Sequence, residues 1–194
     1  MNHFISWFLI PALTFLAAGP GDWFTLNFSA VGSVFPRNII LFLCILLICC
    51  YYHSCVNRSF LQVTDYISVK TELFLTNISI FLLILSAFLP YRPSIQPLVS
   101  FLHLAAAFSS TVIFYTAITV VNLKMYALEP KLFSLTAALM MFSIFISISL
   151  LILCKFLITS ILEIFLTLFS CFWLKLLDQR IDRFIRRKHM IARI

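Results

Sequence analysis

The stretch LFSLTAALMMFSIFISISLLIL, residues 132–153, contains no charged side chain and is long enough to cross a lipid bilayer as one helix. A helix that spans the hydrocarbon needs roughly 20 apolar residues. Backbone groups in lipid must be hydrogen-bonded internally, and the alternating pattern typical of membrane β-strands is absent. This stretch therefore predicts a transmembrane α-helix and an all-α fold.

Five other segments have the same character. They predict a polytopic bundle of about six spans over residues 1–177, followed by a tail at 178–194. An alternative for the first segment is a signal peptide covering residues 1–19, cleaved after the small residues at 17–19, although Lys and Arg are absent from its beginning. The predicted spans other than 132–153 are residues 4–18, 38–56, 72–90, 98–122 and 156–176.

The composition agrees with a membrane protein. Hydrophobic residues make up 62% of the chain and charged residues only 11%, and Phe occurs 22 times. A soluble domain is about half apolar and about a quarter charged, so this chain could not cover its surface with polar groups. Membrane lipids are therefore the expected surroundings and partners. The net charge of +7 is concentrated after the last span, which favours an anionic membrane surface over nucleic acid as the partner of that charge.

The distribution of basic residues predicts the orientation. With the C-terminus in the cytoplasm, eleven of the fourteen Lys and Arg residues lie on the inner side, and Arg37, Arg92 and Lys155 lie outside. Six spans then place both termini in the cytoplasm, and the plasma membrane is the expected location. Trp7 and Trp173 are predicted to anchor the inner interface, where amphipathic rings are enriched.

All six cysteines lie in or beside apolar segments, without the spacing of metal ligands. We expect small core residues and no disulfide framework, metal site or cofactor.

In span 98–122, the small residues Ala106 and Ser110 are four positions apart, a spacing that is typical of close helix packing in lipid.

The first outer loop, about residues 19–37, mixes aromatic and hydrogen-bonding side chains. Asp22, Asn27 and Ser29 are candidate ligand-binding residues for a lipid headgroup or another outer ligand. The alternative is a plug that closes the bundle. Asn27 also begins a glycan acceptor pattern, and the sequence leaves its modification open.

His103 and Glu163 form a second candidate site. Both lie roughly 8–10 Å below the outer boundary when depth is counted along their spans, so they could meet if their helices are neighbours. Ionisable groups in lipid usually face the bundle interior. Lys155 is a rival partner for the carboxylate. Such a contact could simply hold helices together, or it could form a polar pocket or a proton-sensitive element.

The tail has an amphipathic pattern. Ile181, Phe184, Ile185 and Ile191 recur at helical spacing, and basic residues occupy the other side. This pattern predicts a helix that lies on the anionic inner leaflet, or only a topology signal. The candidate membrane-surface residues are Arg183, Arg186, Arg187 and Lys188.

The short first span, the motifs NFS at 27–29 and GS at 32–33, and the run LHLAAAF at 102–108 carry a resemblance. They resemble the superfamily of damage-regulated autophagy modulators and FGF-receptor-activating proteins, which includes small bacterial six-span proteins of unknown function. The resemblance implies six helices with both termini in the cytoplasm and a role linked to membrane lipids or membrane traffic. It implies no agreed catalytic residues, and it points to His103 and the region of Asn27 and Ser29.

The sequence thus favours a non-catalytic multi-pass protein that binds or organises lipid, or a membrane-protein partner, through its outer side. No catalytic residue is assigned, since Ser/His/Asp and zinc-enzyme motifs are absent. Two alternatives stay open. One is a small transporter or channel, and the other is a membrane-embedded lipid-modifying enzyme that uses His103 and Glu163.

Overall fold

The computed structural model describes residues 4–20, 22–32, 37–155 and 157–191, and the regular structure within these ranges is helical. Ser33, Phe156 and Arg193, which entered the sequence predictions, lie outside them. In chain order the elements are a wide π-helical turn η1 (Ile5–Leu9), α1 (Ile10–Ala18), α2 (Phe28–Gly32), α3 (Arg37–Gln62), α4 (Lys70–Phe88), α5 (Pro97–Leu128), α6 (Pro130–Leu153) and α7 (Ser160–Ile191).

Helix boundaries follow residues that restrict the backbone. Pro97 and Pro130 begin α5 and α6, where a missing N–H costs nothing because a first-turn N–H has no partner inside the helix. Gly19 follows α1 with a φ of 62°, and Lys155 follows α6 with a φ of 53°. Both are left-handed conformations that a continuing helix cannot adopt, so the chain turns there.

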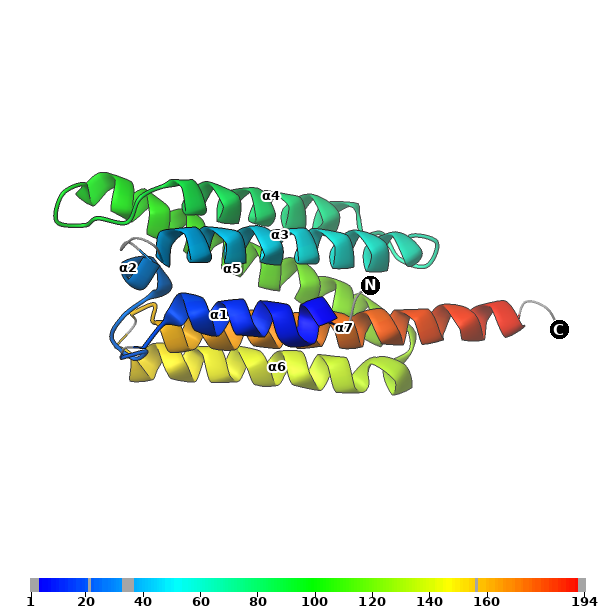
Figure 1. The fold of residues 1–194 in the computed structure, drawn as a ribbon. Helices are drawn as coiled ribbons and strands as arrows, with labels where there is room; N and C mark the ends of the chain where they lie inside the picture. The colour runs from blue at the N-terminus through cyan, green and yellow to red at the C-terminus, as the bar shows by residue number, and fades with distance from the viewer. Residues whose placement is uncertain (1–3, 21, 33–36, 156, 192–194) are drawn as a thin grey trace.

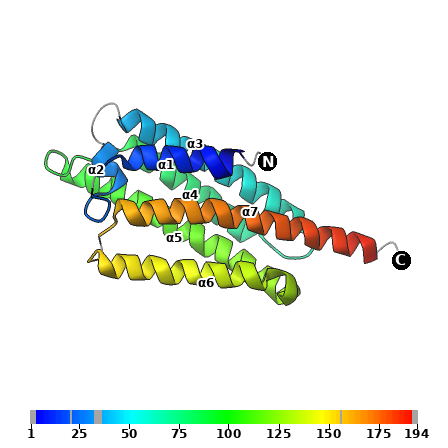
Figure 2. The same cartoon turned by 60° about the horizontal axis from the view of Figure 1, so that its bottom comes forward.

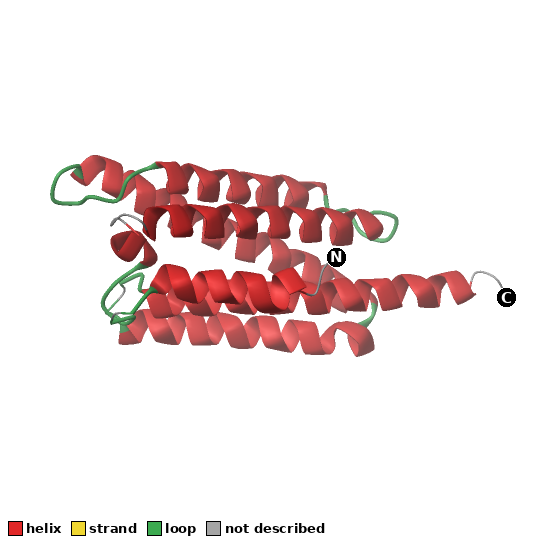
Figure 3. Cartoon of the chain, in the orientation of Figure 1, coloured by secondary structure: helices red, strands yellow, loops and turns green. Residues whose placement is uncertain are grey.

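The long helices run up and down in one bundle, with loops gathered at its two ends (Figures 1 and 3). We call one end the cap end, where α1, α4 and α6 finish and α3, α5 and α7 begin. The other is the tail end, beyond which α7 projects. Helix α7 contacts α1, α3 and α6, while α4 and α5 pack against each other, α4 against α3 and α5 against α6 (Figure 2).

Five helices, α3 to α7, are long and apolar enough to cross a membrane. They match five of the six predicted spans. The first segment forms a shorter apolar helix from Ile5 to Ala18, about 21 Å at ~1.5 Å per residue, against a hydrocarbon core of ~30 Å. A crossing by this segment stays a prediction.

The outer surface of the bundle is apolar. Phe74, Phe81 and Phe88 recur every seven residues on α4, and each exposes more than 60% of its surface. Spacing of seven places them on one helix face. A row of exposed Phe on one helix face is unusual on a soluble protein and is the surface expected against acyl chains.

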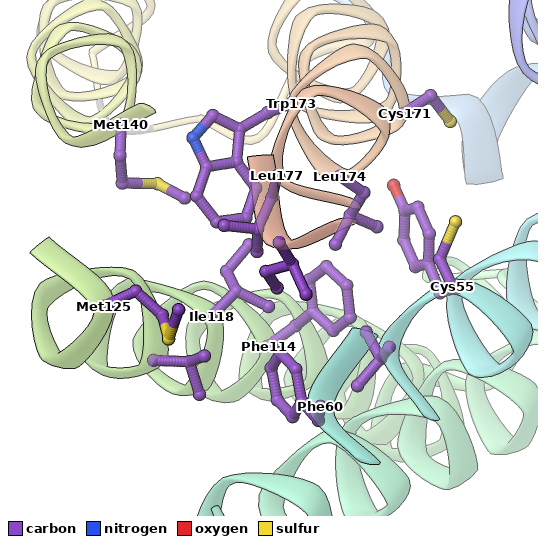
Figure 4. Packing of buried hydrophobic residues seen from close by; sticks show 14 of the residues in the cluster. Cys55, Phe60, Phe114, Ile118, Met125, Met140, Cys171, Trp173, Leu174 and Leu177 are labelled. Carbon is purple, nitrogen blue, oxygen red and sulfur yellow. The ribbon is translucent and has the colours of Figure 1, made fainter. Parts of the chain in front are cut away.

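The core is built around α7 (Figure 4). Trp173, Leu174 and Leu177 are almost fully buried among residues of α3, α5 and α6. The indole N–H of Trp173 donates to the Thr136 carbonyl at 2.9 Å. The prediction that Trp173 anchors the inner interface is therefore wrong, because its helix face points into the protein. Trp7 is half exposed.

Of the six cysteines, all but Cys50 are buried and all are free thiols.

Close packing of α4 on α5 confirms the prediction from small residues. The hydroxyls of Ser79 and Ser110 donate to each other's backbone carbonyls, each at 2.8 Å. Ala106 is buried one turn earlier on α5. Small side chains let the two backbones approach closely enough for these bonds.

Residues 178–191 continue α7 without a break. Ile181 and Phe184 are buried, and Phe184 packs on the rings of Tyr66 and Phe133. The predicted amphipathic pattern is present, but this part of its apolar side contacts the protein instead of the inner leaflet. Arg183, Arg186 and Arg187 are exposed on the other side, while the exposed Lys188 lies one turn after Phe184 with its ammonium over that ring, 5.5 Å from the centroid.

A charged cluster joins α3 to α7 at the tail end. The Asp178 carboxylate is almost completely buried and accepts a hydrogen bond from the Ser59 hydroxyl at 3.1 Å. Its oxygens also lie 3.7 Å from Arg58 Nε and 3.7 Å from Lys175 Nζ. A buried carboxylate needs such partners, because desolvation of an unpaired charge is costly.

Candidate functional site at the cap end

The predicted first outer loop, which follows α1 in the structure, is fixed to the start of α7. The backbone N–H and the hydroxyl of Ser160 both donate to the Leu26 carbonyl, at 2.7 and 2.8 Å. The N–H of Ile161 donates to the Trp23 carbonyl at 3.0 Å. First-turn N–H groups of a helix have no partner within it, so the loop satisfies donors that would otherwise be unpaired.

Asp22 and Asn27 shape this loop. Asp22 Oδ1 accepts the Phe24 N–H at 3.0 Å, and its backbone carbonyl accepts the N–H groups of Thr25 and Leu26, which closes a turn. Asn27 Oδ1 accepts the Ala30 N–H at 2.7 Å, as an N-cap side chain does. Of the predicted ligand-binding residues, these two therefore have local structural roles.

Ser29 lies on α2 and contacts His103 on α5. The two side chains approach to 2.5 Å between Ser29 Oγ and His103 Nε2. His103 Nδ1 lies 2.9 Å from the Leu89 carbonyl, which can only accept. Nδ1 therefore carries a proton, and in a neutral ring Nε2 is the acceptor of the Ser29 hydroxyl proton. The imidazole is buried, and the Tyr91 ring lies beside it with 5.6 Å between centroids.

Glu163 accepts a hydrogen bond from Phe28, the residue that precedes Ser29 on α2. Its Oε2 accepts the Phe28 N–H at 2.7 Å. His103 and Glu163 thus each bind α2, through the adjacent residues Ser29 and Phe28, and the hydrogen bonds of the described residues include none directly between the two side chains. The predicted equal depth agrees with this arrangement. Among the ion pairs of the described residues there is none between Glu163 and Lys155, whose side chain is exposed.

A cavity of about 450 Å³ lies between α5, α6 and α7. Ser29 and Glu163 line it together with mostly apolar side chains of these helices. Exposed residues in its wall, Phe108, Val112 and Ile148, show that it opens on the side of the bundle. Along α5 its lining extends from Leu104 to Val120, about 24 Å at ~1.5 Å per residue. Its volume is within the ~300–1,000 Å³ typical of small-molecule sites.

Two further cavities meet at the same place. One of about 130 Å³ lies deeper in the bundle and is lined by Ser29, His103 and Glu163. Another of about 230 Å³ lies toward the cap end, where the exposed polar residues Asn38 and Arg92 form part of its wall beside His103 and Ser29. Ser29 therefore lies where an apolar side cavity and a more polar cap-end cavity come together.

Several parts of this site were not predicted. The Leu89 carbonyl and the Phe28 N–H are backbone groups, whose positions no side-chain pattern reveals. Tyr115, which lines two of the cavities, donates its hydroxyl to the Leu166 carbonyl at 3.2 Å and accepts from Ser170 at 2.9 Å. In the sequence, only the nearby polar residues Thr116 and Thr119 hint at a polar contact there.

Within the described residues, no group of three or more His, Cys, Asp or Glu side chains could hold a metal ion. The fold and site define a helical bundle with membrane-spanning dimensions and a mixed polar and apolar pocket at one end. Comparison with protein-family models, curated proteins and solved structures finds no match to the chain. The resemblance to the autophagy-modulator superfamily therefore stays a prediction.

Proposed function

We propose that this protein binds a membrane lipid, with the acyl chain in the cavity between α5, α6 and α7 and the polar head at Ser29, His103 and Glu163. The observation that carries this proposal is the roughly 450 Å³ apolar cavity whose lining includes Ser29 and Glu163. An amphiphile needs such a surface, because burial of its apolar chain is favourable and its polar head requires hydrogen-bonding partners.

The side opening supports a ligand that enters from the bilayer. Phe108, Val112 and Ile148 form an exposed apolar rim, so a chain could slide between the helices without passing through water. Glu163 and the imidazole of His103 offer acceptors and donors at the other end. A headgroup with hydroxyl or amine donors fits the carboxylate best.

We also propose the topology that gives this site its location. The cap end faces outward and the tail end faces the cytoplasm, because eleven of the fourteen Lys and Arg residues then lie inside. Both termini are cytoplasmic if the first segment crosses, and the plasma membrane is the proposed location. The exposed residues Arg183, Arg186, Arg187 and Lys188 then contact anionic inner-leaflet lipid.

Native mass spectrometry of the detergent-extracted protein tests lipid binding. We expect the wild-type chain to retain one lipid. Ala107→Phe, which fills a position lining both the side cavity and the deeper cavity, should lower retention at least tenfold. Glu163→Gln should lower it less, because the amide keeps one acceptor oxygen in place of the two of the carboxyl group.

Ala138→Phe is the matched control, since Ala138 is exposed on α6 and lines none of these cavities. Equal retention by Ala107→Phe and Ala138→Phe would contradict the assignment of the cavity. Unchanged retention in Glu163→Gln would count against a headgroup at the carboxylate. A transporter remains the alternative function, and solute flux through proteoliposomes that is lost in Ala107→Phe would favour it.

A further inference from the structure

We propose that Ser29 is a nucleophile that takes an acyl group from an ester lipid, with His103 as its general base. This inference rests on the lipid site proposed above and assigns it a reaction. A serine hydroxyl is a weak nucleophile unless an adjacent base removes its proton. Ser29 Oγ lies 2.5 Å from His103 Nε2, which is within the distance that proton transfer requires.

The imidazole is held in the protonation pattern that a base needs. The Leu89 carbonyl accepts the Nδ1 proton at 2.9 Å, so the lone pair of the neutral ring is on Nε2 and points to Ser29. Catalytic triads use a carboxylate for this orientation. A carbonyl orients the ring in the same way, but it has no full charge to stabilise the imidazolium, so the expected turnover is slow.

Access to Ser29 comes from two chemically different sides. The side cavity between α5, α6 and α7 is apolar and would hold the acyl chain. The cap-end cavity has Asn38 and Arg92 in its wall, both exposed, so it is the route for a polar acceptor. Ser29 lines both cavities. An ester carbonyl entering from one side and a hydroxyl acceptor from the other would therefore meet at the same residue.

The reaction balances without a redox partner. Ser29 Oγ forms a bond to the ester carbonyl carbon as its proton passes to His103 Nε2. The bond between that carbon and the alcohol oxygen then breaks, and the departing alcohol takes the proton from Nε2. Water or another alcohol attacks the acyl–serine ester in the same way, which releases the acyl group and restores the Ser29 hydroxyl.

Glu163 is a positioning residue in this scheme. Its carboxylate fixes the Phe28 N–H at 2.7 Å, and Phe28 directly precedes Ser29. Glu163→Ala, which removes the acceptor of that N–H, should therefore slow the labelling of Ser29, and Glu163→Gln, which retains an acceptor, should label faster than Glu163→Ala.

An alkyl fluorophosphonate with a long chain tests the inference on the full-length protein in lipid nanodiscs. Intact mass spectrometry and peptide mapping measure the rate and place of phosphonylation. We expect one adduct, on Ser29. His103→Asn and His103→Gln should label at least ~100-fold more slowly, as expected for removal of a general base. Ser109→Ala is the control, because Ser109 is on the same helix as His103 but lines none of the three cavities.

The outcomes separate this inference from lipid binding. A wild-type protein that retains lipid but gives no Ser29 adduct would overturn the nucleophile and leave the lipid site standing. A wild-type protein that retains no lipid would instead contradict the proposed function. Labelling at unchanged rate in a folded His103 variant would overturn the role of the base. Lipid retention and Ser29 labelling are both measured on the wild-type protein, so these two tests hold even if a variant fails to fold.

Discussion

The hydroxyl of Ser29 lies 2.5 Å from Nε2 of His103, although 74 positions separate the two residues in the sequence. This bond connects the short helix α2 to α5. Glu163 connects the same helix to α7 through the Phe28 N–H. Together these contacts fasten α2 beside the three cavities, all of which Ser29 lines.

Removal of the Ser29 hydroxyl should loosen this cap. Ser29→Ala leaves His103 Nε2 buried without its partner, which costs about 1–3 kcal/mol of stability. We expect a lower Tm in thermal unfolding followed by intrinsic fluorescence in detergent. Ser109→Ala should leave the Tm within error of wild type. Equal Tm values for Ser29→Ala and wild type would show that the bond contributes no stability.

Glu163→Ala should weaken the other attachment of α2. The Phe28 N–H loses its side-chain acceptor, and a buried donor left unsatisfied costs about 1–3 kcal/mol. We expect faster amide exchange over residues 28–32 than in wild type, measured by hydrogen–deuterium exchange. Exchange around Ile181, at the tail end of α7 and eighteen residues beyond Glu163, serves as the internal reference. Unchanged exchange over α2 would contradict the role given to Glu163.

The buried carboxylate at the tail end should be more sensitive than its exposed neighbour. Asp178→Ala leaves Lys175 buried with a partner removed, and breaking a buried pair costs about 3–5 kcal/mol. Asp182, which approaches Arg58 at 3.5 Å, is partly exposed, so Asp182→Ala should cost about 1 kcal/mol or less. Thermal unfolding of the two variants measures the difference. A similar Tm loss in both would argue against a buried network.

Trp173 should contribute through packing and through its indole N–H. Trp173→Ala is expected to destabilise the bundle by about 3–5 kcal/mol, as large core truncations do. Trp7→Ala, at a half-exposed position, should have a much smaller effect. Denaturation in a graded detergent–denaturant mixture compares them. A larger effect at Trp7 would contradict the burial of Trp173.

The basic side of the tail predicts a preference for anionic lipid. A variant with four Gln substitutions should show less enrichment of anionic over zwitterionic lipid adducts. Each basic residue near the surface contributes about 1 kcal/mol of attraction to anionic lipid. The substituted residues are Arg183, Arg186, Arg187 and Lys188. Native mass spectrometry from a mixed-lipid nanodisc measures this ratio. The single lipid proposed for the side cavity should remain, because none of the four residues lines it. An unchanged ratio would leave these residues without a lipid partner.

The sequence was sufficient for the long helices, because charge-free apolar runs have few alternatives. Residues 98–122 were predicted as a span, and α5 extends to Leu128, since the helix continues beyond the apolar run until Glu129 and Pro130 end it. The amphipathic pattern of the tail was also recognised. Its apolar side was assigned to lipid, however, because periodicity shows that a face is buried but not what covers it.

The candidate site was predictable only in part. His103 and Glu163 attracted attention as ionisable groups in apolar spans, and counting depth placed them at one level. Their connection through Phe28 and Ser29 depends on where a loop folds back, and no helical period encodes that. Trp173 shows the same limit, since its depth suggested an interface while its helix face decides that it is buried.

Photocrosslinking with a lipid that carries a diazirine in its acyl chain tests the central claim most directly. After irradiation of the wild-type protein in nanodiscs, peptide mapping should place a saturable adduct on residues 104–120 of α5 and on the facing part of α6. Ala107→Phe should remove that adduct while labelling of the exposed Phe74, Phe81 and Phe88 face persists. Labelling confined to that outer face, equal in both proteins, would contradict a lipid bound between the helices.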